Sequence, residues 1–315
     1  MSQSKRIHFS LVFAMEPVVL DVAKVYESQK DVLKKEDVMA LKEWADSKKF
    51  YAAEFDELEL IFFLCECEYD VEKAKKRITN ATIFQSRSSI FQNMDFRSDE
   101  LKAAMDTVLV SCLTLKDEIP GQLAIYMRVL CEDAKLVNAS NLIKVFISYS
   151  YLWFRSEVPP VNHILIVDLD VVTLAHLGTL DLRTLRELSC FYNHFYFGTL
   201  MKVHLINVGP WIDRLLGLLK TTMGREFSEK ICVHRDASNL HEFMALGHLP
   251  KELGGDFLSF NQLHVGMKEL LEKHADELMN KYKVHSSGFL QIHSAPHTEP
   301  DLFGVDGTFR QLEVD

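Results

Sequence analysis

The sequence lacks the short motifs by which many enzymes and metal proteins are recognised. The 315-residue chain has no CxxC pair, no GxxxxGK or GxGxxG phosphate loop, no GxSxG elbow and no HExxH zinc helix. The segment His241–Ala245 begins like that zinc helix but has alanine where the second ligand would stand. Of the six cysteines only Cys65 and Cys67 are close together, so we expect free thiols in a reducing compartment and no metal site.

The chain also lacks a basic block and a long apolar run. Its 35 basic and 45 acidic residues give a net charge of −10, which disfavours nucleic acid as a partner but leaves contact with an anionic membrane open. No apolar run approaches the roughly 18 residues of a membrane-spanning helix. The start, MSQSKRIHFSLVFAM, resembles a signal peptide only weakly, because His8 and Ser10 interrupt its apolar core. We therefore expect a cytoplasmic protein.

Hydrophobic spacing divides the chain into a helical part and a mixed part. The first ~95 residues have helical periodicity, with Asp70 as a helix N-cap, and residues 88–100 are expected to form a linker. Beyond them, expected strands at 122–130, 163–169, 201–208 and 229–234 alternate with expected helices at 141–155, 181–196 and 211–220. A further helix is expected at 265–282, followed by a polar tail. This alternation predicts an α/β fold with a mostly parallel sheet.

The segment HILIVDLDVVTLAH, residues 163–176, carries two acids that invite a catalytic interpretation. Asp168 and Asp170 follow an apolar strand, as in aspartate-nucleophile phosphatases and in some metal-dependent glycosyltransferases. No later acidic pair follows to hold Mg²⁺, and no nucleotide-binding motif accompanies the acids. The alternative is structural: Asp168 ends a strand and accepts backbone N–H groups, and His176 hydrogen-bonds in the same turn.

Aromatic residues recur on the inner sides of three expected helices: Tyr149 and Trp153, then Phe191, Tyr192 and Tyr196, then Trp211. Such residues form either an ordinary core or the wall of a closed apolar cavity. Periodicity alone leaves both interpretations open.

Several segments, taken in order, resemble one known family. These are FFLCECEYDVEKA (62–74), IVDLDVVTLAHL (166–177), MKVHLINVGP (201–210), EKICVH (229–234) and LPKELGG (249–255). They are similar to landmarks of the CRAL-TRIO lipid-binding proteins, which include the α-tocopherol and retinaldehyde carriers. The ending DLFGVDGTFRQLEVD resembles that of insect-type members.

The resemblance implies a fold and a function. It implies a helical N-terminal domain at 16–95, a CRAL-TRIO α/β domain at 96–262, and a C-terminal helix and tail at 263–315. The sheet would floor an apolar pocket closed by a mobile helix, Trp211–Lys220. The implied function is non-enzymatic binding and intracellular transfer of a retinoid, tocopherol, carotenoid or other isoprenoid lipid. The expected protein is a monomer that meets membranes transiently and needs no cofactor besides its lipid.

The resemblance also assigns residues to the site. The implied ligand-binding residues are Val145, Tyr149, Leu152, Leu165, Leu188, Phe191, Tyr192, Tyr196, Leu200, Val203, Trp211, Leu215 and Leu218. Apart from the resemblance, the positive charge of Lys202, Lys220, Arg225 and Lys230 leads us to expect that these residues contact anionic lipid.

The sequence departs from the family pattern at several of its positions. Val171 replaces a usual glycine, and Tyr149 replaces a smaller polar residue that can contact ligand. Thr199 and Met201 stand where the vitamin E carrier has basic residues that recognise phosphoinositides. The residues CECE at 65–68 stand where the family has arginine-rich positions. Phosphoinositide-triggered release is therefore not expected. The same departures motivate an alternative function, in which the chain is an interaction or scaffold module with a filled pocket. The third possible function is that of an aspartate-nucleophile phosphatase.

Overall fold

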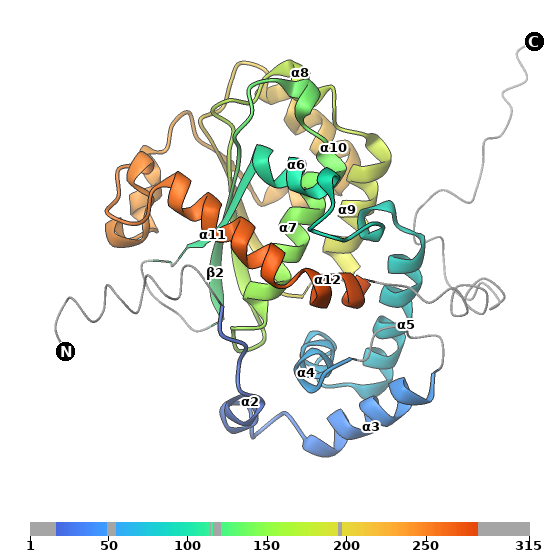
Figure 1. Cartoon of the computed structure of the whole chain (residues 1–315). Coiled ribbons are helices and arrows are strands. Elements are labelled where there is room, and N and C mark those ends of the chain that lie inside the picture. Colours follow the sequence, from blue (N-terminus) through green and yellow to red (C-terminus); the bar gives the residue numbers. More distant parts are fainter. Residues whose placement is uncertain (1–16, 49–54, 114, 116–120, 195–196, 283–315) are drawn as a thin grey trace, which may run out of the picture.

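The computed structural model describes residues 17–48, 55–113, 115, 121–194 and 197–282 (Figure 1). The first helices are α2 (Val22–Ser28), α3 (Lys35–Ser47), α4 (Glu57–Glu66), α5 (Val71–Arg87) and α6 (Asp99–Thr107), with the short 3₁₀ helix η1 (Ser89–Phe91) before α6. Side chains at their N-termini fix where two of them begin. Asp56 and Glu59 form a capping box at α4, and Asp70 accepts the backbone N–H groups of Glu72 and Lys73 at α5, as predicted.

The rest of the described chain alternates strands and helices. Its elements are β1 (Val108–Leu113), β2 (Gln122–Val129), η2 (Ala134–Leu136), α7 (Ala139–Phe154), β3 (Asn162–Asp168), α8 (Leu174–Leu177), α9 (Leu182–His194), β4 (Thr199–Ile206), α10 (Ile212–Glu229), β5 (Ile231–Val233), η3 (Ser238–Glu242), η4 (Leu246–His248), η5 (Lys251–Leu253), α11 (Phe260–Lys273) and α12 (Ala275–Tyr282). The five strands form one sheet in the order β1-β2-β3-β4-β5. Only β1 and β2 are antiparallel, which confirms the predicted mostly parallel sheet.

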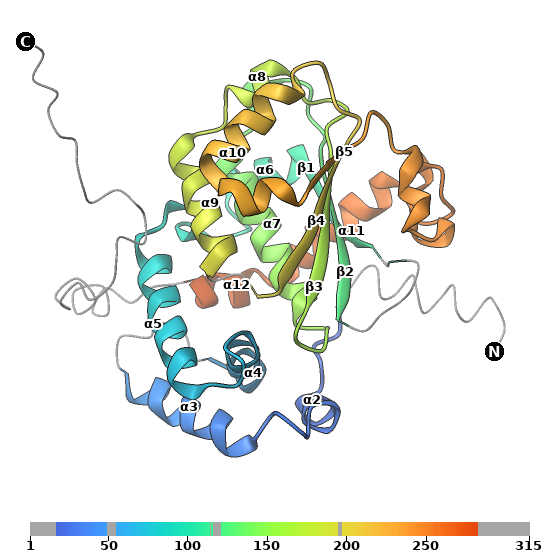
Figure 2. The ribbon, with the colours of Figure 1, turned by 180° about the vertical axis from the view of Figure 1, so that it is seen from behind.

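The strand order determines which helices share a face of the sheet. Parallel strands β2 to β5 follow one another in space as in sequence, and each crossover has the same preferred handedness. The crossover helices α7, α9 and α10 therefore lie on one face (Figure 2). Residues after β5, including α11, cover the other face.

Side-chain alternation along the strands separates the two faces. Leu123, Leu165 and Val203 point toward the crossover helices, while Tyr126 and Ile166 belong to the opposite core. The face toward α7, α9 and α10 is apolar along β2, β3 and β4 apart from His163 of β3. A candidate site for an apolar molecule is therefore this face and its three helices.

Three local expectations from the sequence are wrong, and one strand was not expected. The expected linker at 88–100 is core, because Ile90, Phe91 and Phe96 are at most 3% exposed. Strand β1 was not anticipated, since both of its faces are buried and it shows no alternation. The helix expected at 265–282 is divided at His274 into α11 and α12. The expected gate helix 211–220 continues to Glu229, with Trp211 as its N-cap residue.

One continuous hydrophobic core joins the helical part to the mixed part. It contains α4 and α5 residues such as Phe63 and Ile78 together with Phe146 of α7 and Leu278 of α12. Buried Glu187 of α9 adds a polar tie by accepting hydrogen bonds from the Ser88 hydroxyl (2.8 Å) and the Ser89 backbone N–H (2.9 Å). These bonds fix helix α9 to the helical part. The predicted domain boundary at residue 95 stays a prediction.

Candidate functional site

Asp168, at the carboxyl end of β3, has both carboxylate oxygens occupied by hydrogen bonds. Oδ2 accepts from the Tyr126 hydroxyl (2.6 Å) and Arg128 Nη1 (2.5 Å). Oδ1 accepts from Asn207 Nδ2 (2.9 Å) and the backbone N–H of Asp170 (3.1 Å). Four donors hold this carboxylate against three neighbouring segments, so its geometry is that of a structural anchor. The predicted bond to a backbone N–H is present.

His176 closes the turn that follows the strand. Its Nδ1 lies 3.1 Å from the backbone nitrogen of Thr173 and its Nε2 lies 3.0 Å from the carbonyl oxygen of Cys131. A backbone N–H only donates, so Nδ1 accepts and Nε2 carries the proton that is donated to Cys131. The predicted hydrogen-bonding role of His176 in this turn is confirmed.

The implied ligand-binding residues fall into two adjoining apolar clusters. The cluster along α7 and α9 contains Val145, Tyr149, Leu152, Leu188, Phe191 and Tyr192. The cluster beneath α10 contains Leu200, Val203, Trp211 and Leu215. Leu165 and Tyr192 contact both clusters, while Leu218 is half-buried on α10. Tyr196 lies outside the described residues. The structure thus brings these side chains to one region, and their contact with a ligand stays a prediction.

Helix α7 presents different side chains to the sheet and to α9. Tyr149 is 3% exposed, and burial is the largest cause of its raised pKa, to which Cys112 of β1 also contributes. Phe146 and Phe154 lie on another stripe of the helix, where Phe146 stacks 6.2 Å from Tyr192 of α9. The resemblance assigns Tyr149 to the ligand-binding set and does not assign Phe146, and contact of Tyr149 with a ligand stays a prediction.

The imidazole of His163 is buried among aromatic side chains of α7 and α9. His163 is not among the residues that the sequence predicted for the site. It is 1% exposed, with its ring centroid 5.5 Å from that of Phe154 and 6.1 Å from that of Tyr192. Burial, with a smaller contribution from Lys230, lowers the pKa of His163 to about 3. The imidazole is therefore neutral at pH 7. The available signal was its place in the strand, two residues before Leu165 and on the same face.

Helix α10 covers the apolar face through apolar contacts. Leu215 is 7% exposed beneath it, and Phe227 meets Tyr192 edge to face at 6.4 Å. Within the described residues, the side-chain hydrogen bonds and ion pairs of α10 stay inside the helix and its C-cap residue. Gly224 interrupts the helix with φ 82° and ψ 178°, a conformation that essentially only glycine adopts. A helix held in this way can leave the sheet without breaking a side-chain hydrogen bond to another element.

The four basic residues assigned to anionic lipid differ in their surroundings. Lys202 and Lys220 are exposed. Arg225 forms an ion pair with Glu229 (2.6 Å), and half-buried Lys230 forms one with Glu226 (3.1 Å). Two of the four charges are therefore already neutralised by neighbours on α10, and lipid contact by the set stays a prediction.

Glu66, one of the residues 65–68 where the resemblance implies arginine, contacts two other segments. Its carboxylate accepts the backbone N–H of Gly198 (3.1 Å) and lies 3.7 Å from Arg77. Burial raises its pKa, and Arg77 opposes that change. The acid thus joins α4 to the start of β4 at this position.

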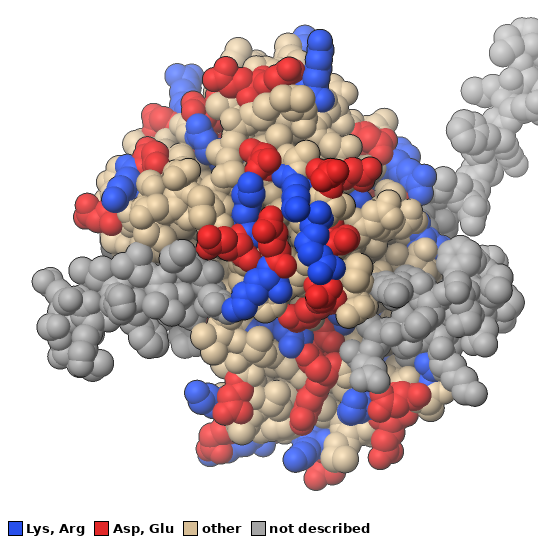
Figure 3. Space-filling model, viewed as in Figure 1, with Lys and Arg blue, Asp and Glu red and all other residues tan. Residues whose placement is uncertain are grey.

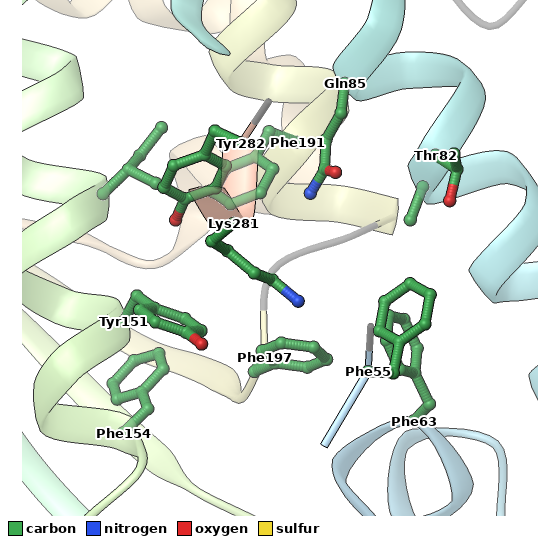
Figure 4. A pocket seen from close by; sticks show the side chains of 12 residues that line it. Phe55, Phe63, Thr82, Gln85, Tyr151, Phe154, Phe191, Phe197, Lys281 and Tyr282 are labelled. Carbon is green, nitrogen blue, oxygen red and sulfur yellow. The ribbon is translucent and has the colours of Figure 1, made fainter. Parts of the chain in front are cut away.

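A small cavity lies between the helical part and α7, α9 and α12, away from α10 (Figure 4). Its volume is about 40 Å³, and the Lys281 ammonium projects into it among the rings of Tyr151, Phe197 and Phe55. Lys281 Nζ is 2.5 Å from buried Glu59 and 4.6 Å from the Phe55 ring centroid. At about 10–15 Å³ per water molecule, the cavity suits a few waters and is far too small for an isoprenoid chain.

The surface in view in Figure 3 carries mixed charge. Basic and acidic side chains are interspersed over this face. One ion pair joins Arg97 to Asp276 of α12 at 2.7 Å. Among the residues with described positions, no helix is long and apolar enough to cross a bilayer. The same residues contain no group of three or more His, Cys, Asp or Glu side chains placed to hold one metal ion.

Comparisons with known proteins identify the mixed part of the chain. Residues 110–255 match a family model described as "CRAL/TRIO domain". No curated protein matches the chain. A solved structure titled "Crystal structure of Sfh5" aligns with 12% identity and a TM-score of 0.46, covering 81% of this chain and 97% of that one. The matched residues run from β1 to the segment after η5 and include α7, α9 and α10. The chain therefore carries a CRAL/TRIO domain at residues 110–255.

Proposed function

We propose that the chain binds one small hydrophobic molecule between the sheet, α9 and α10 and transfers it between membranes. The CRAL/TRIO domain supports lipid binding in general. The observation that carries the proposal is the cover formed by α10, an amphipathic helix that rests on an apolar sheet face without side-chain polar ties to other described elements. The ligand we propose is an isoprenoid-like lipid such as a retinoid, tocopherol or carotenoid. The cytoplasm and a monomeric state remain predictions.

The energetics suit a covered carrier. Removing about 400 Å² of ligand surface from water is worth on the order of 10 kcal/mol before the cost of association. Lifting α10 exposes Trp211 and Leu215, which are 8% and 7% exposed in the closed form. Water opposes this exposure and a bilayer interface accepts it, so opening is favoured at membranes.

Vesicle binding tests the proposed opening. We expect Trp211→Asp to weaken membrane binding and to slow ligand transfer, because a carboxylate at that place opposes insertion. Thr221→Asp adds the same charge at an exposed position of α10 and serves as the control. Equal transfer rates in the wild type and both variants would show that α10 does not insert in this way.

The second candidate is an interaction module, and close packing favours it. The implied ligand-binding residues of the two clusters, which exclude Tyr196 and Leu218, already pack in apolar cores, and Val145, Val203 and Leu152 are 4% exposed or less. Organic extraction of the purified chain followed by mass spectrometry separates the two functions. A stoichiometric lipid supports the carrier. A chain that yields no lipid, and binds none when titrated with retinol and tocopherol, would favour the interaction module.

A further inference from the structure

Helix α9 lies between the helical part and α10, the helix that covers the proposed site. It contacts α5 and η1 on one side and α10 on the other (Figure 2). Glu187 and Phe191, one helical turn apart, face the helical part, where the ring of Phe91 lies 5.2 Å from that of Phe191. Tyr192 lies on another stripe of the helix and meets Phe227 of α10 at 6.4 Å. One wall of the site therefore rests on the helical part and also meets the cover.

The carboxylate of Glu187 is occupied by donors from the start of η1 and from its own helix. Glu187 is 3% exposed. Its Oε2 accepts from the Ser88 hydroxyl (2.8 Å), the Ser89 hydroxyl (2.8 Å) and the Ser89 backbone N–H (2.9 Å). Its Oε1 accepts from Arg183 Nε (2.9 Å), one turn earlier on α9. Hydrogen bonds to an ionised carboxylate are stronger than those between neutral groups, so the contact between α9 and η1 resists displacement.

The attachment of α9 contrasts with that of α10. Within the described residues, the side-chain hydrogen bonds and ion pairs of α10 stay inside that helix and its C-cap residue. We propose that Glu187 is a positioning residue that holds α9 as the fixed wall of the site while α10 moves, and that it thereby slows the loss of ligand to water. This inference rests on the proposed carrier function and assigns ligand retention to a carboxylate that faces away from α10.

Retention requires the seam between α9 and α10 to stay closed between contacts with membranes. Without the Glu187 carboxylate, the buried Ser88 hydroxyl and the Ser89 backbone N–H lose their shared acceptor. Water can replace this acceptor only if α9 moves away from η1, so the loss favours a displaced α9. A displaced α9 draws Tyr192 away from Phe227 and weakens the seam. Ligand then escapes into water without a membrane.

Three variants separate the hydrogen bonds of Glu187 from its other properties. Glu187→Ala removes the acceptor. Glu187→Gln keeps one acceptor oxygen for Ser88 and Ser89 and gives up only the ion pair with Arg183, whose side chain is 70% exposed. Ser88→Ala removes one of the three donors to Oε2 and should act in the same direction as Glu187→Ala with a smaller effect. Because Ser88→Ala removes only a hydroxyl, the test does not depend on whether Glu187→Ala folds.

Glu59→Ala is the matched control. Glu59 is also a buried acid, 2% exposed, that links the helical part to the rest of the chain. It accepts from the Tyr151 hydroxyl of α7 (2.9 Å) and pairs with Lys281 of α12 (2.5 Å). Its loss therefore weakens the junction of the same two parts without removing a bond to α9.

Release of retinol, and of tocopherol in a second series, from the loaded full-length protein measures retention. The ligand passes either to an excess of cyclodextrin without vesicles or to vesicles. We expect Glu187→Ala to release ligand to cyclodextrin at least about tenfold faster than the wild type, and Glu187→Gln and Glu59→Ala to stay within about twofold of it. Transfer to vesicles should change less in Glu187→Ala, because a bilayer already favours the open form. A variant that only lost stability would not show this difference between the two acceptors.

The outcomes separate this inference from the carrier function. If neither Glu187→Ala nor Ser88→Ala releases ligand faster than the wild type, or if Glu187→Gln releases it as fast as Glu187→Ala, the positioning role is wrong and the carrier function stands. If Glu59→Ala accelerates release as much as Glu187→Ala, general loss of stability explains the effect and the positioning role is again wrong. If the wild type binds neither retinol nor tocopherol, the proposed function fails and the inference fails with it.

Discussion

Replacing Asp168 by alanine tests whether this residue anchors the fold. Its side chain is fully buried, and Arg128, its ion-pair partner, is 14% exposed. The substitution leaves that guanidinium and the Tyr126 hydroxyl without their shared acceptor and also removes the bond from Asn207. Breaking a buried ion pair by removing one partner costs about 3–5 kcal/mol. We therefore expect Asp168→Ala to lower the free energy of unfolding by about that amount.

Asp170→Ala is the matched control. Asp170 also pairs with Arg128, at 2.6 Å, but its side chain is 57% exposed, so its loss should cost no more than about 1 kcal/mol. Urea denaturation of the wild type and both variants measures the two costs. Equal costs, or a change below about 0.5 kcal/mol for Asp168→Ala, would refute the anchoring role. Mg²⁺-dependent phosphatase activity lost on Asp168→Asn would restore the catalytic interpretation.

Two further predictions concern α10 and the buried histidine. Gly224→Ala should destabilise the protein by about 1–3 kcal/mol because Gly224 has a positive φ. Gly217→Ala lies at an open helical position and should stabilise the protein by about 0.5–1 kcal/mol. Thermal denaturation compares the two variants, and a Gly224→Ala variant as stable as the wild type would show that the break in α10 is unnecessary. Between pH 6.5 and about 3 the unfolded chain binds a proton at His163 that the folded chain does not, so acidification lowers the free energy of unfolding. His163 accounts for about 1.4 kcal/mol of this loss per pH unit, and His163→Phe should remove that part. Burial also lowers the pKa of His204, to about 4, so the pH profile of the variant keeps some slope; an unchanged profile would contradict the buried neutral state of His163.

The sequence was sufficient to predict the mostly parallel sheet and the hydrogen bonds of the turn that follows β3. Alternating strands and helices predicted the parallel layer, and a capping side chain predicted the start of α5 at Asp70. Asp168 and His176 were assigned to hydrogen bonds because short polar side chains after a strand bond to nearby backbone, and the structure contains those bonds. These are local relations, which spacing along the chain encodes.

Features that depend on three-dimensional packing were not predictable in the same way. The segment with Ile90 and Phe96 has the polar composition of a linker, yet the core formed by distant elements buries its apolar side chains. Helix α7 is apolar on several sides, so periodicity did not show which of its side chains meets α9, where Phe146 stacks on Tyr192. His163 was overlooked because a histidine among apolar residues gives no sign of where its ring will lie.

Transfer between vesicles tests the central claim most directly. Donor vesicles loaded with geranylgeraniol and acceptor vesicles without it are mixed, and ligand arrival is followed as the protein concentration is raised. We expect the transfer rate to rise in proportion to wild-type protein and to fall at least about tenfold for Leu215→Asp, which places a charge beneath α10, while the exposed Thr221→Asp variant transfers normally. Circular dichroism confirms that each variant is folded. Transfer no faster with the wild-type protein than without it would contradict a carrier covered by α10.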